Sequence, residues 1–101
     1  MSIFEKHRDT LKKFVEIYGT KDQLNMLVEK MGKLTSALHR YNRKIDKSKT
    51  DDDRKALQNQ TEQGLAQVLV LAEQAKIIFD ERNIANHAEQ QINKTKGKLT
   101  V

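Results

Sequence analysis

A chain of 101 residues is long enough for one domain and too short for two. Only 37% of its residues are hydrophobic and 33% are charged, so any core must be a narrow seam between amphipathic helices. The lack of cysteine excludes disulfides and thiolate metal sites, and the net charge of +5 favours anionic partners. With no proline and only four glycines, the sequence predicts a single all-α domain over residues 1–101.

The first predicted helix begins at Ser2, which forms a capping-box pattern with Glu5, and stops at Gly19. The opening residues 1–6 include the charged Glu5 and Lys6 and do not resemble a signal peptide. No apolar stretch approaches membrane-spanning length. We therefore expect a cytoplasmic protein, of a bacterium or a phage-infected cell, with no membrane partner.

A second helix is expected over about residues 21–45. Thr20 followed by Gln23 repeats the capping-box pattern at its start. Its apolar stripe follows the 3.6-residue period and consists of Leu24, Leu27, Val28, Met31, Leu34, Leu38, Tyr41 and Ile45.

Residues 46–53 contain no apolar residue and are predicted to form the main loop. A third helix should follow to about Phe79, and a short fourth helix should begin near Asn83 and end before Gly97. Two long helices joined by a polar loop are expected to pair antiparallel, with the end helices packed against them. The predicted fold is a small antiparallel bundle of about four helices.

The positive charge is concentrated in residues 29–50. This window holds seven Lys or Arg and two acids, which equals the net charge of the whole chain. Lys30, Lys33, Arg40 and Lys44 share one stripe that borders the apolar face of the second helix. A solvated charged face is the ordinary explanation of such a stripe, and an anion-binding wall is the functional one.

Glutamines recur at helical spacing beside the apolar stripe of the third helix. They are Gln60, Gln63, Gln67 and Gln74. Glutamine is a good helix former, so these side chains need no further role. Their amides can also donate and accept hydrogen bonds to a phosphate oxygen or the edge of a base.

Three segments, in this order along the chain, carry a resemblance to a known family. The first is residues 18–38, where the matching residues are Tyr18-Gly19, Gln23-Leu24, the run LVEKMGKL at 27–34, and Ala37-Leu38. The second is LAQVLVLAEQAKIIF at 65–79, and the third is INKTKGKL at 92–99. Together they resemble phage-type and bacterial MazG-like nucleoside-triphosphate pyrophosphohydrolases.

The resemblance implies a metal site that this chain has altered. The family places carboxylates three residues apart on two facing helices, where they bind Mg²⁺ and position the triphosphate. The matching positions here are Lys30, Lys33, Gly64 and Gln67, none of which is a carboxylate. Glu29 and Glu62 lie beside these positions, but a helical step of about 100° per residue aims them elsewhere.

Two of the matching positions carry an ammonium group, which can neutralise phosphate without metal. The leading hypothesis is therefore a catalytically inactive MazG-like protein that binds a nucleotide or another phosphorylated ligand and sequesters it. No catalytic residue, metal ligand or cofactor is predicted. The predicted ligand-binding residues are Lys30, Lys33, Arg40, Gln63, Gln67, Lys94 and Lys98.

Two alternatives differ in class from this hypothesis. One is a Mg²⁺-dependent hydrolase with a rearranged site that uses Glu29, Glu62, Glu73 or Asp80. The other is a protein or nucleic-acid interaction module that uses the basic second helix. The chain has no recognisable DNA-binding motif and only five aromatic residues, which argues against nucleic acid.

Three further expectations concern packing and assembly. Phe4, Phe14 and Phe79 are expected in the core. His7, His39 and His87 have no second ligand at helical spacing and are expected at the surface. The narrow seam predicts a marginal monomer, and the resemblance implies a homodimer or tetramer with sites between subunits.

Overall fold

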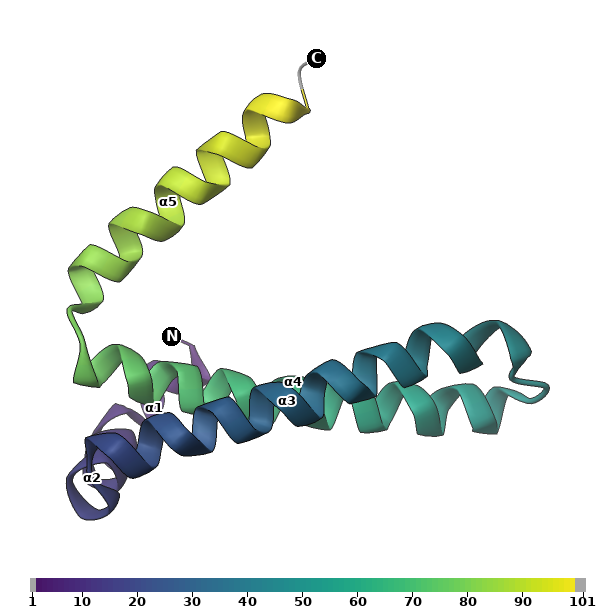
Figure 1. Cartoon of the computed structure of the whole chain (residues 1–101), viewed down its shortest axis with the longest axis horizontal. Helices are drawn as coiled ribbons and strands as arrows, with labels where there is room; N and C mark the ends of the chain where they lie inside the picture. Colours follow the sequence, from purple (N-terminus) through teal and green to yellow (C-terminus); the bar gives the residue numbers. More distant parts are fainter. Residues whose placement is uncertain (1, 100–101) are drawn as a thin grey trace.

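The computed structural model describes residues 2–99, and this part of the chain is helical with no strand. The elements in chain order are α1 (Ile3–Lys6), α2 (Arg8–Tyr18), α3 (Thr20–Lys44), the 3-10 turn η1 (Ile45–Lys47), α4 (Asp51–Ile78) and α5 (Glu81–Lys98). Figure 1 shows α3 and α4 running antiparallel, joined at the far end by the short polar connection. The predicted all-helical class and the two long central helices are confirmed.

Side chains cap three of the helices at their N-termini. Ser2 accepts a hydrogen bond from the backbone N–H of Glu5 at 3.2 Å, as the sequence pattern predicts. Thr50 and Asp80 do the same for α4 and α5, at 3.1 Å in each case. Each cap satisfies one of the N–H groups that a helix start leaves without an intrahelical partner.

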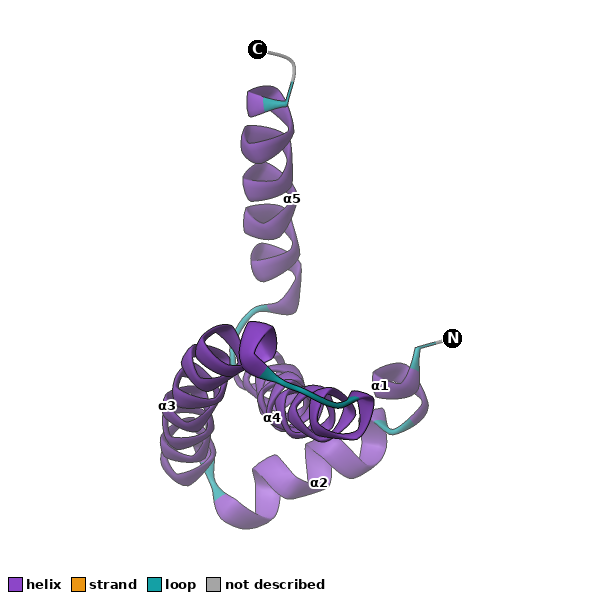
Figure 2. Cartoon of the chain, turned by 90° about the vertical axis from the view of Figure 1, so that its right-hand side faces the viewer, coloured by secondary structure: helices purple, strands orange, loops and turns teal. Residues whose placement is uncertain are grey.

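The region before α3 differs from the prediction in two places, at His7 and at the start of α3. The first predicted helix is divided at His7 into α1 and α2. The expected Thr20–Gln23 capping box does not form, because Gly19 is the N-cap residue and no side chain caps α3. Gly19 has a φ of 81°, which residues with a Cβ rarely adopt. The chain therefore turns sharply at this glycine, and α3 leaves the end of α2 in a different direction (Figure 2).

The interface between α3 and α4 is the main packing surface of the chain. Its centre includes Gly64, where an added Cβ would lie 3.5 Å from Cδ1 of Leu34. Thr61, one turn away, is buried and donates its hydroxyl to the carbonyl of Leu57 at 2.9 Å. The buried hydrophobic residues of the described chain are Leu11, Leu57 and Leu71. The core is a narrow seam, as the composition predicts.

Gly64→Ala is expected to stabilise the fold by about 0.5–1 kcal/mol, because alanine loses less backbone entropy on forming a helix. A Cβ at 3.5 Å from Leu34 is an ordinary van der Waals contact. Urea unfolding would measure the gain. Gly32→Ala is the matched control, since nothing lies within 4 Å of a Cβ there. A loss of stability at Gly64 together with a gain at Gly32 would show that the α3–α4 seam is too tight for a methyl group.

The end helices behave differently from each other. Helix α2 packs against both α3 and α4, as expected. Helix α5 contacts α4 near their junction and then projects away from the bundle (Figures 1 and 2). The expectation that this helix packs against the central pair is wrong for the described chain. A bidentate ion pair fixes its start, with Arg8 Nη2 2.6 Å from Glu81 Oε1 and Arg8 Nη1 3.2 Å from Glu81 Oε2.

The Arg8–Glu81 pair predicts a dependence of stability on pH. The hydrogen bond and the charge of Arg8 lower the pKa of Glu81 below its ordinary value of 4.5. The pair therefore contributes stability above pH 4.5, and this contribution is lost as the pH falls through the lowered pKa. We expect the stability difference between wild type and Glu81→Gln to be present at pH 7 and to shrink below pH 4.5. A difference that stays constant from pH 7 to pH 3 would contradict this.

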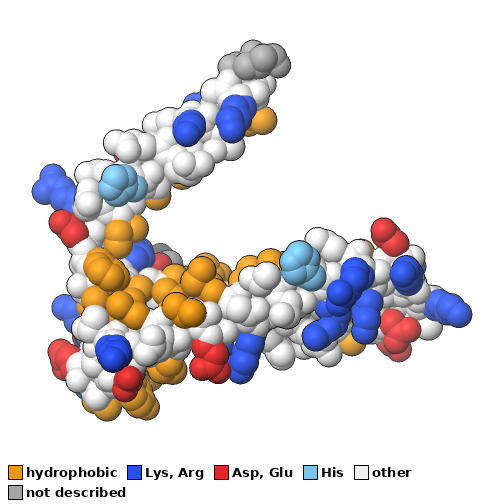
Figure 3. All heavy atoms as spheres, viewed as in Figure 1, with side chains coloured by type: hydrophobic (Ala, Val, Ile, Leu, Met, Phe, Trp, Pro, Cys, Tyr) orange, Lys and Arg blue, Asp and Glu red, His pale blue; other side chains and the backbone are white. Residues whose placement is uncertain are grey.

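A large part of the apolar surface has no cover within the described chain. Phe79, expected in the core, is 59% exposed, and Ile92 and Leu99 on α5 are 65% and 83% exposed. Figure 3 shows hydrophobic side chains gathered where α5 and the bundle form an angle. None of the helices within residues 2–99 is long and apolar enough to cross a membrane.

Candidate functional site

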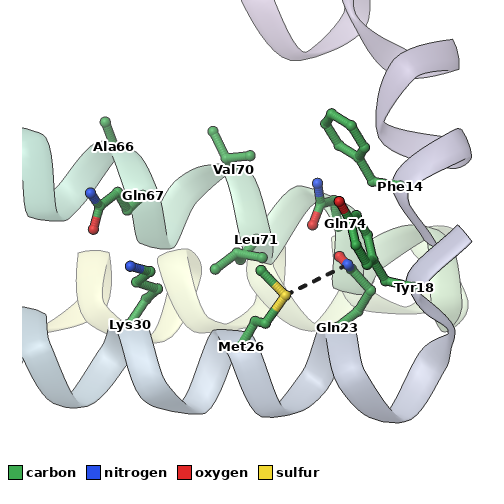
Figure 4. A pocket seen from close by; sticks show the side chains of 10 residues that line it. All are labelled: Phe14, Tyr18, Gln23, Met26, Lys30, Ala66, Gln67, Val70, Leu71 and Gln74. Atoms are coloured by element: carbon green, nitrogen blue, oxygen red, sulfur yellow. Dashed lines mark hydrogen bonds between the residues drawn. The ribbon is translucent and has the colours of Figure 1, made fainter.

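A pocket of about 430 Å³ opens where α2 crosses the antiparallel pair α3–α4. Ten side chains from these three helices line it, and Figure 4 shows them from close by. Its volume lies within the usual range of small-molecule sites. Most of the lining is apolar, with a few polar groups placed at its two ends.

The antiparallel pairing of α3 and α4 arranges the lining in layers. Figure 4 shows Gln23 beside Gln74, Met26 beside Leu71, and Lys30 beside Gln67. Successive layers are three or four residues apart on each helix, which is about one turn. The pocket therefore has a glutamine end near α2, an apolar middle, and an end that combines an ammonium with an amide.

The glutamine end contains two buried amides. Gln23 is 3% exposed and Gln74 is 4% exposed. The side-chain oxygens of both are enclosed and have no hydrogen-bond partner within residues 2–99. The amide nitrogen of Gln23 lies 3.9 Å from the sulfur of Met26, which is a weak acceptor. A buried polar atom without a partner costs about 1–3 kcal/mol, so most proteins avoid it.

Two aromatic side chains of α2 flank the glutamine end. Phe14 and Tyr18 are one turn apart, and their ring centroids are 6.4 Å apart at an interplanar angle of 45°. Both line the pocket and both remain partly open to solvent. The expectation that Phe14 belongs to the core is therefore wrong. Aromatic rings at the mouth of a pocket offer flat apolar surface to a ligand.

The opposite end carries the positive charge of the pocket. Lys30 is half-buried and makes no ion pair with any carboxylate of residues 2–99. No carboxylate or histidine is present among the described side chains that line the pocket. The charge of this ammonium is thus available to an anion, and the amide of Gln67 beside it can donate two further hydrogen bonds.

The structure brings together two of the seven predicted ligand-binding residues, Lys30 and Gln67. Lys33 points outward, with its side chain 63% exposed and its ammonium 3.3 Å from Glu29. Arg40 and Gln63 are exposed and do not line the pocket. The remaining two predicted residues, Lys94 and Lys98, lie on α5, which points away from the pocket in the same chain.

Lys33 and Gly64, the other two positions that the resemblance matches to metal ligands, lie apart from each other in space. Gly64 faces Leu34 in the seam, whereas Lys33 faces solvent. Lys30 and Gln67 alone of the four matching positions share the pocket. One matching residue from each helix, Lys30 of α3 and Gln67 of α4, therefore lines the pocket, and Lys33 and Gly64 lie outside it.

The carboxylates of the hydrolase alternative do not converge on this pocket. Three of them have other partners: Glu29 pairs with Lys33 at 3.3 Å, Glu73 pairs with Lys76 at 3.1 Å, and Asp80 caps α5. Glu62 is exposed. Within residues 2–99 no group of three or more His, Asp or Glu side chains is arranged to hold a metal ion.

The sequence interpretation missed the glutamine end. Gln23 matched a capping pattern, and Gln74 was one of four glutamines along a stripe. Both residues, however, fall in phase with apolar residues, Gln23 one turn before Met26 and Gln74 one turn after Leu71. A glutamine in register with an apolar stripe is the signal that could have identified them.

The chain matches no protein-family model, no curated protein and no solved structure. The side chains of the pocket are therefore the observations from which its function can be argued.

Proposed function

We propose that this protein is a MazG-like protein without the family's metal site, and that it binds a nucleotide or another phosphorylated small molecule in the α2–α3–α4 pocket without metal. The observation that carries the proposal is the pairing of Lys30 with Gln67. These residues occupy metal-ligand positions in the resemblance, come from different helices, and lie side by side in the pocket.

The phosphate end of the proposed site follows from charge. An ammonium without a carboxylate partner, partly shielded from water, attracts a phosphate more strongly than a fully exposed lysine does. Lys30 meets both conditions, whereas Lys33 meets neither. The neighbouring amide of Gln67 adds donors that fit a phosphate oxygen.

The side chains that line the pocket are better suited to binding a phosphorylated ligand than to hydrolysing it. Release of pyrophosphate needs a water molecule activated by a metal or by a general base. The described lining offers an ammonium, amides, a phenol and apolar groups, with no carboxylate or imidazole. We therefore propose sequestration of the ligand as the use of the site.

A thermal-shift titration in EDTA tests the proposal. Mixed nucleoside mono-, di- and triphosphates should raise the melting temperature of the wild-type protein by mass action. No shift with any of them, and no ligand retained after gel filtration, would reject it. The hydrolase alternative is tested with the same panel in Mg²⁺: it requires pyrophosphate release, and binding without turnover excludes it.

We further propose that the chain forms a homo-oligomer, with a second copy covering the apolar side of α5. The accessible surface of 8259 Å² exceeds the value of about 5,900 Å² expected for a compact chain of 11.7 kDa. The radius of gyration of 16.9 Å likewise exceeds the value of about 13 Å for 100 residues. The accessible surface of each chain thus exceeds the compact value by about 2,400 Å². If two chains buried this excess against each other, the total buried area would fall in the range of permanent dimer interfaces.

Sedimentation velocity would test this assembly. We expect a dimer or a larger species at micromolar concentration, and a shift toward monomer for Ile92→Glu. Ile92 is a suitable probe because it is apolar and exposed on α5, so its replacement removes no contact of the core. Asn93→Glu adds the same charge to the adjacent position on α5 and is the control. A wild-type chain that stays monomeric at high micromolar concentration contradicts the proposal.

A further inference from the structure

The far end of the α3–α4 hairpin carries a second group of positive charges, which we call the distal basic cluster. Its members are Arg40, Arg43, Lys44 and Lys47. Their spacing of i, i+3, i+4 and i+7 places them on one face at the end of α3 and on η1. All are exposed, and none forms an ion pair with a carboxylate of residues 2–99. Figure 3 shows Lys and Arg side chains gathered over this part of the hairpin.

The distal basic cluster lies beyond the ammonium end of the pocket. Lys44 is fourteen residues after Lys30, which places it about 21 Å farther along α3 and only about 40° around the helix axis. Helix α2 crosses the α3–α4 pair at its other end, and no helix of the described chain covers the distal half of the hairpin (Figure 1). Lys30 therefore opens onto a bare surface that leads to the cluster.

Amide groups of α4 lie along this surface. Gln63 and Gln60 follow Gln67 at intervals of about one turn toward the distal end, and both are exposed. Their amides can donate hydrogen bonds to phosphate oxygens. Glu29, which lies near the start of the surface, is paired with Lys33 at 3.3 Å, so its charge is balanced. The surface from Lys30 to the distal basic cluster thus combines cations with neutral donors.

We propose that this surface binds a linear chain of phosphates longer than a triphosphate, held at Lys30 and Gln67 and extending to the distal basic cluster. This inference rests on the proposed function, since it extends the phosphate end of the same ligand. The phosphates of a triphosphate extend over about one helical turn, about 5.4 Å. Lys30 and Lys44 are about four turns apart, so a single ligand reaches both only if it carries many phosphates.

Inorganic polyphosphate fits the surface better than a nucleic acid does. Proteins that bind single strands stack the bases on aromatic side chains. Within residues 30–67 the one Phe, Tyr or Trp is Tyr41, which is half-buried and in phase with Leu34 of the seam. Polyphosphate has no bases and presents only charged oxygens, which ammonium, guanidinium and amide groups recognise directly.

Titration with linear polyphosphates of increasing length, in EDTA at constant ionic strength, tests this inference. Affinity is expressed per phosphate, so that a long chain gains nothing from its larger number of equivalent positions. We expect a chain that reaches from Lys30 to Lys44 to bind at least about tenfold more tightly than tripolyphosphate, because the linked contacts act together. The logarithm of its affinity should also fall more steeply with the logarithm of the salt concentration, since more cations are engaged.

The outcomes separate this inference from the proposed function. Equal affinity per phosphate for tripolyphosphate and the long chain overturns the inference, and binding of nucleotides then leaves the proposed function intact. Tighter binding of single-stranded or duplex nucleic acid at the same phosphate concentration also overturns it. Failure of every nucleotide and polyphosphate to bind rejects both proposals.

Variants assign the effect of chain length to the distal basic cluster. Lys44→Gln/Lys47→Gln removes two of its charges and should abolish most of the gain of the long chain over tripolyphosphate. Lys13→Gln/Lys21→Gln removes two exposed charges of α2 and α3 outside this surface and should keep the gain. With folding verified by circular dichroism, a gain that survives in the first variant, or is lost equally in both, overturns the inference.

Discussion

Lys30→Glu should weaken binding of a phosphorylated ligand by at least about a hundredfold. The substitution removes the ammonium that faces the pocket and places a carboxylate against the phosphate. Lys30 is half-buried, so water screens this repulsion less than it would at the surface. Isothermal titration with a nucleotide at constant ionic strength would measure the loss.

Lys33→Glu is the matched control for this prediction. It makes the same change of charge three residues further along α3, at a side chain that is 63% exposed and lies outside the pocket. Its effect should remain below about threefold, because exposed charges at this distance are strongly screened. If both variants lost binding equally, the anion would be held by the general charge of the basic helix.

Gln74→Met is expected to stabilise the ligand-free protein. The substitution replaces a buried amide, whose oxygen has no partner within the described chain, by an apolar side chain of similar volume. Removing an unpaired buried acceptor should gain about 1–2 kcal/mol. For a domain of this size, each kcal/mol raises the melting temperature by roughly 4–8 °C.

Thermal unfolding at one fixed protein concentration would measure this effect, since oligomers change their apparent stability with concentration. Gln63→Met is the control, because an exposed amide of the same helix is already hydrated and its removal should be nearly neutral. A clear loss of stability in Gln74→Met would show that the amide is satisfied in the free protein, and that it contributes to the fold.

The helices themselves could be predicted from the sequence because their signals are local. The apolar stripe of the second predicted helix and the polar run after it led to α3 and to the turn before α4, with boundaries within a few residues. Ser2 and Gly19 marked the ends of the first helical segment, as capping chemistry requires. The break at His7 carries no such signal and was not predicted.

The site could be predicted only in part, since it depends on how two helices align. Lys30 and Gln67 come from stripes that the sequence places correctly, and they meet because α3 and α4 pack antiparallel in one particular register, in which Gly64 lies opposite Leu34. A change of one residue in that register would move a different side chain into the pocket. Lys94 and Lys98 follow the direction of α5, whose start pairs with Arg8 through Glu81, and a contact between residues so far apart in the sequence has no local signal.

We propose that the pocket holds a phosphorylated ligand without metal. Mass spectrometry of the small molecules released by denaturing the purified protein, isolated in EDTA, tests it most directly. We predict a phosphorylated compound, near one per site, from the wild type and from Lys33→Glu, and none from Lys30→Glu. Wild-type protein that releases nothing and binds none of the nucleotides in titration, or a ligand retained equally by Lys30→Glu, would contradict the claim.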